Sequence, residues 1–280
     1  MPAIKDINEL KKISFEIRKD VIKSLSEAGS GHLGGSLGLA DIFTCLYFNI
    51  LSHNPQNPTW SDRDRLILSI GHVAPVFYTA LAHAGYFEKS ELLTLRKLGS
   101  RLQGHPGKEH GLPGIELSSG SLGQGLSVAV GLALAAKMDN KPWRVFSIHG
   151  DGELQEGSIW EAAMSAAHYK LNNLVALVDR NSLQIDGKTS DVMEIEPLAA
   201  KFESFGWNVI QCSGHDHLAI IESYNKAFQQ HVAPTVIIAQ TVMGKGVKSI
   251  ENDYMWHGKA PSKEQAEKFL IELNESYSSK

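Results

Sequence analysis

The chain has 280 residues, of which 42% are hydrophobic and 21% charged, and its formal net charge is −4. These values are ordinary for a globular protein. The lack of a basic excess argues against nucleic acid or an anionic membrane as a partner. No apolar run approaches the length of a membrane span, and residues 1–12 are polar and charged, unlike a signal peptide. Cys45 and Cys212 lie in apolar surroundings without CxxC spacing, which predicts buried thiols in a reducing, cytoplasmic compartment.

The amino-terminal region predicts two helices joined by a glycine-rich segment. Residues 6–9 (DINE) form a capping box, and apolar residues then recur at helical spacing, so a helix should run to about Ala28. Residues 29–38 are rich in glycine and lead into an expected helix over residues 39–49. Such a segment can bind an anion at the start of the helix, but it equally allows close packing. Alone, it is a weak indication of function.

The rest of the sequence alternates expected strands with expected helices. Short β-rich apolar runs predict strands at residues 62–69, 145–148, 174–178, 207–211 and 235–240. Helices are expected at residues 92–98, 126–138, 158–169, 197–205, 218–229 and 262–277, with another that ends near residue 81. The very apolar helix over 126–138 is expected to supply core and subunit interface, and the charged helix over 262–277 to lie at the surface. This alternation predicts an α/β fold with parallel strands.

The strongest chemical pattern lies in the middle of the chain. The strand over 145–148 leads into Gly150-Asp151-Gly152, and Asn181 follows the strand over 174–178. Parallel strands of one β-α-β unit bring both residues to the same carboxyl edge of the sheet, where open α/β sheets bind ligands. One carboxylate, one amide oxygen and a nearby backbone carbonyl suit Mg²⁺ or Ca²⁺, with phosphate and water oxygens completing the set.

Several other histidines are interpreted as structural. His215 and His217 flank Asp216, which should cap the helix over 218–229. Their alternate spacing resembles a metal motif, but we expect them to serve as cap and surface. In the loop over residues 103–116, we do not interpret the spacing of His105 and His110 as that of a metal pair, and we expect His110 to be a solvated loop residue.

Six separated motifs, between about Leu10 and Lys259, are best considered together. They are Ser30-Gly31-His32, Gly71-His72, Gly104-His105-Pro106, residues 150–157 (GDGELQEG), residues 179–187 (DRNSLQIDG) and Trp256-His257-Gly258. In this order they resemble the transketolase branch of the thiamine diphosphate enzymes. The resemblance implies the α/β thiamine-diphosphate-binding fold, with a mostly parallel central sheet and helices on both faces. It also implies that residues 1–280 form a single domain, the one that binds the cofactor diphosphate.

The resemblance assigns roles to individual residues, with thiamine diphosphate and Mg²⁺ (or Ca²⁺) as cofactors. The implied metal ligands are Asp151, Asn181 and the backbone carbonyl of Leu183. The implied cofactor-binding residues are His72, Gly120, Leu122, Gly152, Glu153, Asn181 and His257. The implied catalytic residues, which would face the substrate hydroxyls and the developing oxyanion, are His32, His105 and His257.

One position departs from the family pattern, and another allows two interpretations. Ile70 departs from the polar or basic residue that many transketolases carry before Gly-His, so only His72 is carried over as a phosphate ligand. Glu156 resembles the family glutamate that links two cofactor sites across a dimer. A capping acid in the first turn of a helix is a nearly equal interpretation of Glu156.

The implied activity is transfer of a two-carbon ketol unit from a ketose phosphate to an aldose phosphate, with the cofactor as electron sink. In full-length transketolases, a second domain supplies the glutamate that activates the cofactor and the side chains that grip the sugar phosphate. We therefore expect the amino-terminal subunit of a split, two-chain transketolase. Its partner would carry the pyrimidine-binding and carboxy-terminal domains in an α2β2 assembly, and this chain would be inactive alone.

Alternative functions share parts of the pattern. The alpha subunit of a 2-oxoacid dehydrogenase first component has Gly-Asp-Gly followed by Asn, but its usual pattern lacks the three histidine motifs at His32, His105 and His257. A deoxyxylulose-phosphate synthase fragment also has Gly-Asp-Gly. A non-catalytic relative that kept the fold is a further alternative. A dinucleotide-binding Rossmann enzyme is excluded, because no G-x-G-x-x-G follows a strand with an acid downstream.

Overall fold

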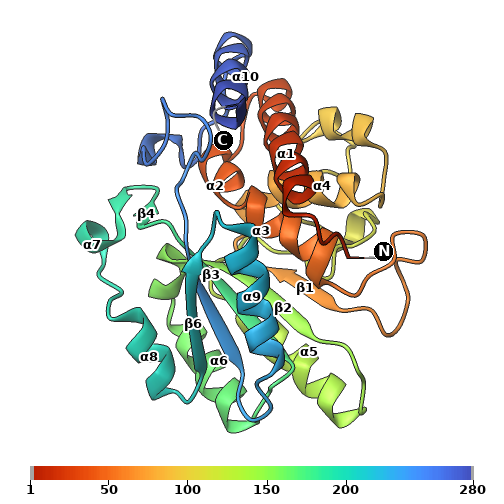
Figure 1. Ribbon diagram of the computed structural model, residues 1–280, viewed down its shortest axis with the longest axis vertical. Coiled ribbons are helices and arrows are strands. Elements are labelled where there is room, and N and C mark those ends of the chain that lie inside the picture. The colour runs from red at the N-terminus through yellow and green to blue at the C-terminus, as the bar shows by residue number, and fades with distance from the viewer. Residues whose placement is uncertain (1–2, 279–280) are drawn as a thin grey trace.

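The structure is a computed structural model that describes residues 3–278. At its centre lies a five-stranded parallel sheet (Figure 1), with the strand order β1-β2-β3-β7-β6. The strands are β1 (Arg65–Leu68), β2 (Val145–Gly150), β3 (Leu174–Arg180), β6 (Asn208–Ser213) and β7 (Thr235–Gln240). A short antiparallel hairpin, β4 (Leu183–Gln184) with β5 (Gly187–Lys188), follows β3. The expected α/β class and the mostly parallel sheet are confirmed.

Helices cover both faces of the sheet, as expected, because successive strand residues point to opposite sides. In β1, Leu66 and Leu68 belong to one hydrophobic cluster and Ile67 to the other. The first cluster includes α1 (Ile7–Ala28), α3 (Ala40–Cys45), α4 (Ala74–His83), α9 (His217–Phe228) and α10 (Lys263–Ser278). The second includes α5 (Gly125–Met138), α6 (Gly157–His168) and α8 (Leu198–Ser204). Figure 1 shows α10 beside α1, against which it buries one face.

The glycine-rich segment is more helical than expected. Leu33–Gly38 forms α2, and the single helix expected over 39–49 is divided into α3 and a π-helical turn, Leu46–Ile50. The glycines serve close packing, since a Cβ on Gly34 would lie 2.6 Å from Cγ of Met243. A helix expected over 92–98 was also misplaced. The structure has a 3-10 helix at Lys89–Thr94, and Arg96 has a left-handed φ of 60° that interrupts regular structure there.

The shorter elements connect the sheet to the loops around it. A four-residue helix, α7 (Thr189–Val192), follows the hairpin. The remaining 3-10 turns are Gly71–Val73, Lys108–His110, Gly152–Gln155 and Tyr254–Trp256. Both cysteines are free thiols, but Cys212 is only half-buried, whereas Cys45 is buried as expected. Within residues 3–278, no helix is both long and apolar enough to cross a membrane.

The carboxyl edge of the sheet has the geometry that the central β-α-β unit predicted. β2 and β3 are adjacent and parallel, with Gly150 opposite Asp179. One residue later, the backbone N–H of Asp151 donates to the carbonyl of Asp179 at 3.2 Å. Asp151 and Asn181 therefore leave neighbouring strands at the same edge. This edge is where the site is built.

Candidate active site

A cavity of about 360 Å³ lies at this edge of the sheet. Every residue that the sequence assigned to metal, cofactor or substrate lines it: His32, His72, His105, Gly120, Leu122, Asp151, Gly152, Glu153, Asn181, Leu183 and His257. These residues come from segments far apart in the sequence, which only the fold brings together. Cavities of this size commonly hold a small ligand.

Four histidines from four separate segments meet in the cavity. The ring centroid of His32, just before α2, lies 4.9 Å from that of His72, 5.7 Å from that of His257 and 6.5 Å from that of His105. The rings of His72 and His257 are 5.2 Å apart. The cluster thus surrounds one small volume with imidazole nitrogens.

These imidazoles are held in the neutral form at neutral pH. Burial lowers the pKa of His32 to about 4, with the neighbouring His257 and His105 lowering it further. Burial also lowers the pKa of His257 and, more strongly, that of His72. A neutral imidazole has one donor nitrogen and one acceptor nitrogen. Each ring can therefore accept a hydrogen bond from a hydroxyl group or donate one to an oxyanion.

Two of the rings carry a buried nitrogen that lacks a protein partner. Nδ1 of His32 and Nδ1 of His257 are inaccessible to solvent and have no hydrogen-bond partner among the described residues. Buried polar atoms without partners are rare in folded proteins and indicate a missing ligand or water. The cavity therefore suits a polar ligand.

Asp151, Asn181 and Leu183, whose oxygens are the expected metal ligands, all line the cavity. Oδ1 of Asp151 accepts a hydrogen bond from the Gly152 N–H at 2.8 Å, and Oδ1 of Asn181 accepts one from the Leu183 N–H at 2.9 Å. Each of these oxygens keeps a lone pair that no donor within residues 3–278 uses. A carboxylate, an amide oxygen and a carbonyl form a hard set that fits Mg²⁺ or Ca²⁺. Within residues 3–278, no cluster of three or more His, Cys, Asp or Glu side chains could hold a metal.

Arg180 is a neighbour of this set that the sequence analysis did not single out. Its Nη1 lies 2.9 Å from Oδ2 of Asp151, and its Nη2 lies 2.9 Å from Oε1 of Glu196. Burial raises the pKa of Asp151, and the hydrogen bond from Arg180 opposes that rise. The only sequence signal was the position of Arg180 directly before Asn181. Its effect is to fix the orientation of the Asp151 carboxylate.

Glu153 lines the cavity, but its carboxylate is occupied by the protein. It is 2% exposed and accepts hydrogen bonds from the Gly123 N–H at 2.8 Å, from Nδ1 of His149 at 3.1 Å and from the Ser69 hydroxyl. Burial alone would raise the pKa of Glu153, but His149 and the other donors outweigh it, and the pKa is lowered. Glu153 thus ties the ends of β1 and β2 to the loop that precedes α5. The partners Ser69 and His149 are separated from Gly123 in sequence, and no motif indicated them.

Glu156 and His110 are both exposed. Glu156 is exposed, lines the cavity and is the N-cap residue of α6, although its side chain makes no capping hydrogen bond there. His110 is exposed, as expected.

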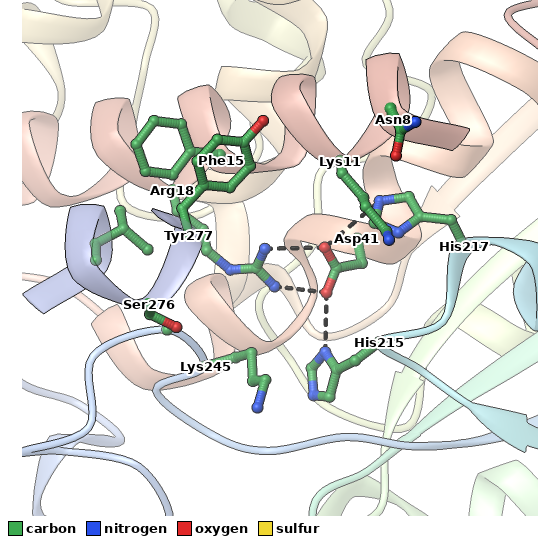
Figure 2. A pocket seen from close by; sticks show the side chains of 12 residues that line it. Asn8, Lys11, Phe15, Arg18, Asp41, His215, His217, Lys245, Ser276 and Tyr277 are labelled. Carbon is green, nitrogen blue, oxygen red and sulfur yellow. Dashed lines mark hydrogen bonds and ion pairs between the residues drawn. The ribbon is translucent and has the colours of Figure 1, made fainter. Parts of the chain in front are cut away.

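The expectation for His215 and His217 was wrong. Asp216 caps α9 as expected, with its carboxylate accepting from the Leu218 N–H at 3.0 Å. His217, however, is buried, and His215 donates from Nδ1 to Asp41 at 2.9 Å (Figure 2). Both belong to a charge network with Asp41 on a separate part of the fold. Their alternate spacing could not reveal this, because Asp41 lies on α3.

The family follows from comparison with known proteins. Residues 10–273 match the family described as "Transketolase, thiamine diphosphate binding domain". This chain belongs to the transketolase family. The match spans all six motifs of the sequence and every residue that lines the cavity, so the expected resemblance is confirmed.

Relatives of similar length are named as transketolase subunits. An apulose-4-phosphate transketolase subunit of Phocaeicola vulgatus is 40% identical over 96% of this chain and 95% of its own length. A 6-deoxy-6-sulfo-D-fructose transketolase subunit of a Clostridium species is 40% identical over 92% of this chain and 93% of its own length. The chain is therefore an amino-terminal transketolase subunit.

Transketolases of greater length match over their first part only. The crystal structure of transketolase from Campylobacter jejuni superposes with a TM-score of 0.90 and 33% identity, covering 96% of this chain and 43% of that one. Human transketolase is 37% identical over 100% of this chain and 44% of its own length. The transketolase match decides against the 2-oxoacid dehydrogenase alternative.

Proposed function

We propose that this chain binds thiamine diphosphate with a divalent cation and, with a second subunit, transfers a two-carbon ketol unit from a ketose phosphate to an aldose phosphate. The observation that carries the proposal is the convergence of four neutral histidines and the Asp151–Asn181 oxygen pair on one cavity. The histidines suit hydroxyls and oxyanions, and the oxygen pair suits a cation that bridges a diphosphate.

Different parts of the cavity wall would hold the metal, the diphosphate and the organic part of the cofactor. Asp151, Asn181 and the carbonyl of Leu183 would bind Mg²⁺ or Ca²⁺. Diphosphate oxygens would accept from His72 and His257, and Gly152, which has no side chain, would let them approach the backbone closely. Gly120 and Leu122, both in the loop anchored by Glu153, would lie along the organic part of the cofactor. Bound thiamine diphosphate supplies the electron sink for cleaving the carbon–carbon bond.

The remaining histidines would face the sugar. His32 and His105 would hydrogen-bond the substrate hydroxyls, and His257 would contact both the diphosphate and the reacting carbon's oxygen. Because burial keeps His32 and His257 neutral, one nitrogen of each ring can donate to a developing oxyanion while the other accepts from a hydroxyl.

The chain would act as one domain in a larger assembly. We infer a partner that carries the pyrimidine-binding and carboxy-terminal domains, in a cytoplasmic α2β2 complex. Relatives of matching length, each named as one subunit of a transketolase, support the existence of a second subunit. The exposed side of α5, which includes Val128 and Met138, is a candidate contact surface for that partner.

A coupled assay tests the proposal. Xylulose 5-phosphate and ribose 5-phosphate are supplied with thiamine diphosphate and Mg²⁺, first to this chain alone and then with a candidate second subunit. Because two relatives are named for apulose 4-phosphate and 6-deoxy-6-sulfofructose, these ketoses serve as further donors. Activity only in the mixture supports the proposal. Activity of the chain alone contradicts the need for a partner, and a mixture that binds cofactor but transfers nothing favours a non-catalytic relative.

A further inference from the structure

A second cavity, of about 370 Å³, lies between α1, α10 and the loop that follows β7. We call it the α1–α10 cavity (Figure 2), and its lining residues include Asn8, Lys11, Phe15, Arg18, Asp41, His215, His217, Lys245, Leu273 and Tyr277. None of these residues lines the active-site cavity.

The floor of the α1–α10 cavity is a buried ion pair. Arg18 donates from both terminal nitrogens to Asp41, at 2.9 and 2.6 Å, and His215 donates to the same carboxylate. Burial alone would raise the pKa of Asp41, but Arg18 and His215 overcome this and hold it well below its ordinary value. Asp41 is therefore a compensated charge. It does not require a cation from outside.

Positive charge remains at the rim of the cavity. Lys11 is exposed and, in the described part of the chain, has no ion pair or hydrogen bond. Lys245 is paired only loosely, with its Nζ 3.4 Å from Oε1 of Glu251. Burial lowers the pKa values of His215 and His217, so neither adds charge near neutral pH. A small anion bound at the rim would neutralise this excess of positive charge.

His217 adds an unused acceptor to the lining. Its Nε2 lies 2.7 Å from the Ser14 hydroxyl, which itself donates to the Leu10 carbonyl. The Asp41 carboxylate also lies 3.6 Å from Nε2, which favours the tautomer with the hydrogen on Nε2 and leaves Nδ1 as an acceptor. Nδ1 has no partner within residues 3–278, although His217 is only 3% exposed. Because Nδ1 is itself inaccessible to solvent, a ligand hydroxyl would donate to it once the ring turns toward the cavity.

An apolar wall completes the cavity. Phe15 and Tyr277 stack with ring centroids 4.3 Å apart, and Leu273 lies beside them in the lining. The cavity thus offers rim cations, a hydroxyl acceptor and a flat apolar surface. These features match a small organic anion with hydroxyl groups and a carbon skeleton, rather than a bare inorganic ion.

The floor is bonded to two segments of the active site. The Val242 N–H donates to Nε2 of His215 at 2.8 Å, and the next residue, Met243, lines the active-site cavity. Arg18 donates from Nε to the Leu37 carbonyl at 3.1 Å, in the short helix that begins directly after His32. A ligand that shifts Arg18 or His215 would therefore move both walls of the cofactor site.

We propose that the α1–α10 cavity is a second binding site, for a small hydroxylated organic anion such as a sugar phosphate or a sugar acid, and that its occupancy is coupled to the affinity for cofactor. The coupling rests on the proposed function, whereas the binding of the anion does not. Linkage requires the effect to be reciprocal, so cofactor would change the affinity for the anion by the same factor.

Calorimetry on the full chain tests the site, with glucose 6-phosphate, gluconate, inorganic phosphate and neutral glucose as probes. Either organic anion, or both, should bind, phosphate more weakly, and glucose not at all. Lys11→Glu and Lys245→Gln should each weaken binding at least about tenfold, as expected for loss of a charge-assisted contact. Lys12→Glu is the matched control, because Lys12 is exposed on the same helix and does not line the cavity.

The outcomes separate this site from the active site. No binding of either organic anion at 10 mM, or binding that both rim variants leave unchanged, would overturn the proposal. A sugar phosphate bound in the active site instead would be sensitive to His105→Ala and indifferent to Lys11→Glu. For the coupling, saturating gluconate or glucose 6-phosphate should change the affinity for thiamine diphosphate at least about threefold in the native chain and not in Lys11→Glu. An unchanged affinity overturns the coupling, and a chain that binds no thiamine diphosphate at all contradicts the proposed function instead.

Discussion

Replacing Glu153 by glutamine tests whether one buried carboxylate positions the loop that faces the cofactor. Its two oxygens accept from backbone N–H groups on opposite sides, Gly123 at 2.8 Å and Gly150 at 3.3 Å. A glutamine keeps only one acceptor oxygen, so either the buried Gly123 N–H or the half-buried Gly150 N–H must lose its partner. A buried donor without an acceptor costs about 1–3 kcal/mol, and losing the charge weakens the bond that remains. We expect Glu153→Gln to lower the free energy of unfolding by about 2–3 kcal/mol.

Equilibrium unfolding in urea at pH 7 measures this loss. Glu156→Gln is the matched control, since Glu156 lies in the same motif but is exposed and makes no capping hydrogen bond. The control should stay within about 0.5 kcal/mol of the native chain, as surface changes usually do. Glu153→Gln should also weaken thiamine diphosphate binding, because Gly120 and Leu122 belong to the tethered loop. A Glu153→Gln chain as stable as the control would refute the positioning role.

The other predictions concern the metal, the substrate and pH. Asp151→Ala or Asn181→Ala should abolish metal-dependent retention of thiamine diphosphate. An unchanged affinity for thiamine diphosphate in calorimetry would contradict the metal assignment. His32→Ala and His105→Ala should slow turnover in the reconstituted complex while cofactor binding stays nearly intact. Loss of cofactor binding would show that these residues contact the cofactor and not the substrate. Because burial lowers the pKa of His32 from 6.5 to about 4, its neutral form contributes stability above pH 6.5 that is lost as the pH falls toward 4. Urea unfolding across that range should show a smaller loss in His32→Gln, and equal losses would contradict the buried, neutral assignment.

The sequence by itself determined the fold class and the positions of the chemical groups. Alternation of strand-like and helix-like segments was enough to predict the parallel sheet, since hydrophobic periodicity is a local property. The β-α-β unit around Asp151 and Asn181 fixed their common edge, because adjacent parallel strands leave no other arrangement. The six histidine- and glycine-containing motifs pointed to transketolase, and the family match confirmed it.

Only the tertiary structure decided which side chains support those groups and how they are charged. The partners of Glu153 lie directly after β1, on β2 and before α5, and the carboxylate of Asp41 on α3 holds His215 from the loop before α9. Contacts between residues so far apart leave no periodic trace, so His215 and His217 were misjudged and Arg180 was missed. The neutral state of His32 likewise comes from burial beside other histidines, a property of the closed cavity. Local patterns thus specify the elements and the reactive groups, whereas long-range packing sets their environment.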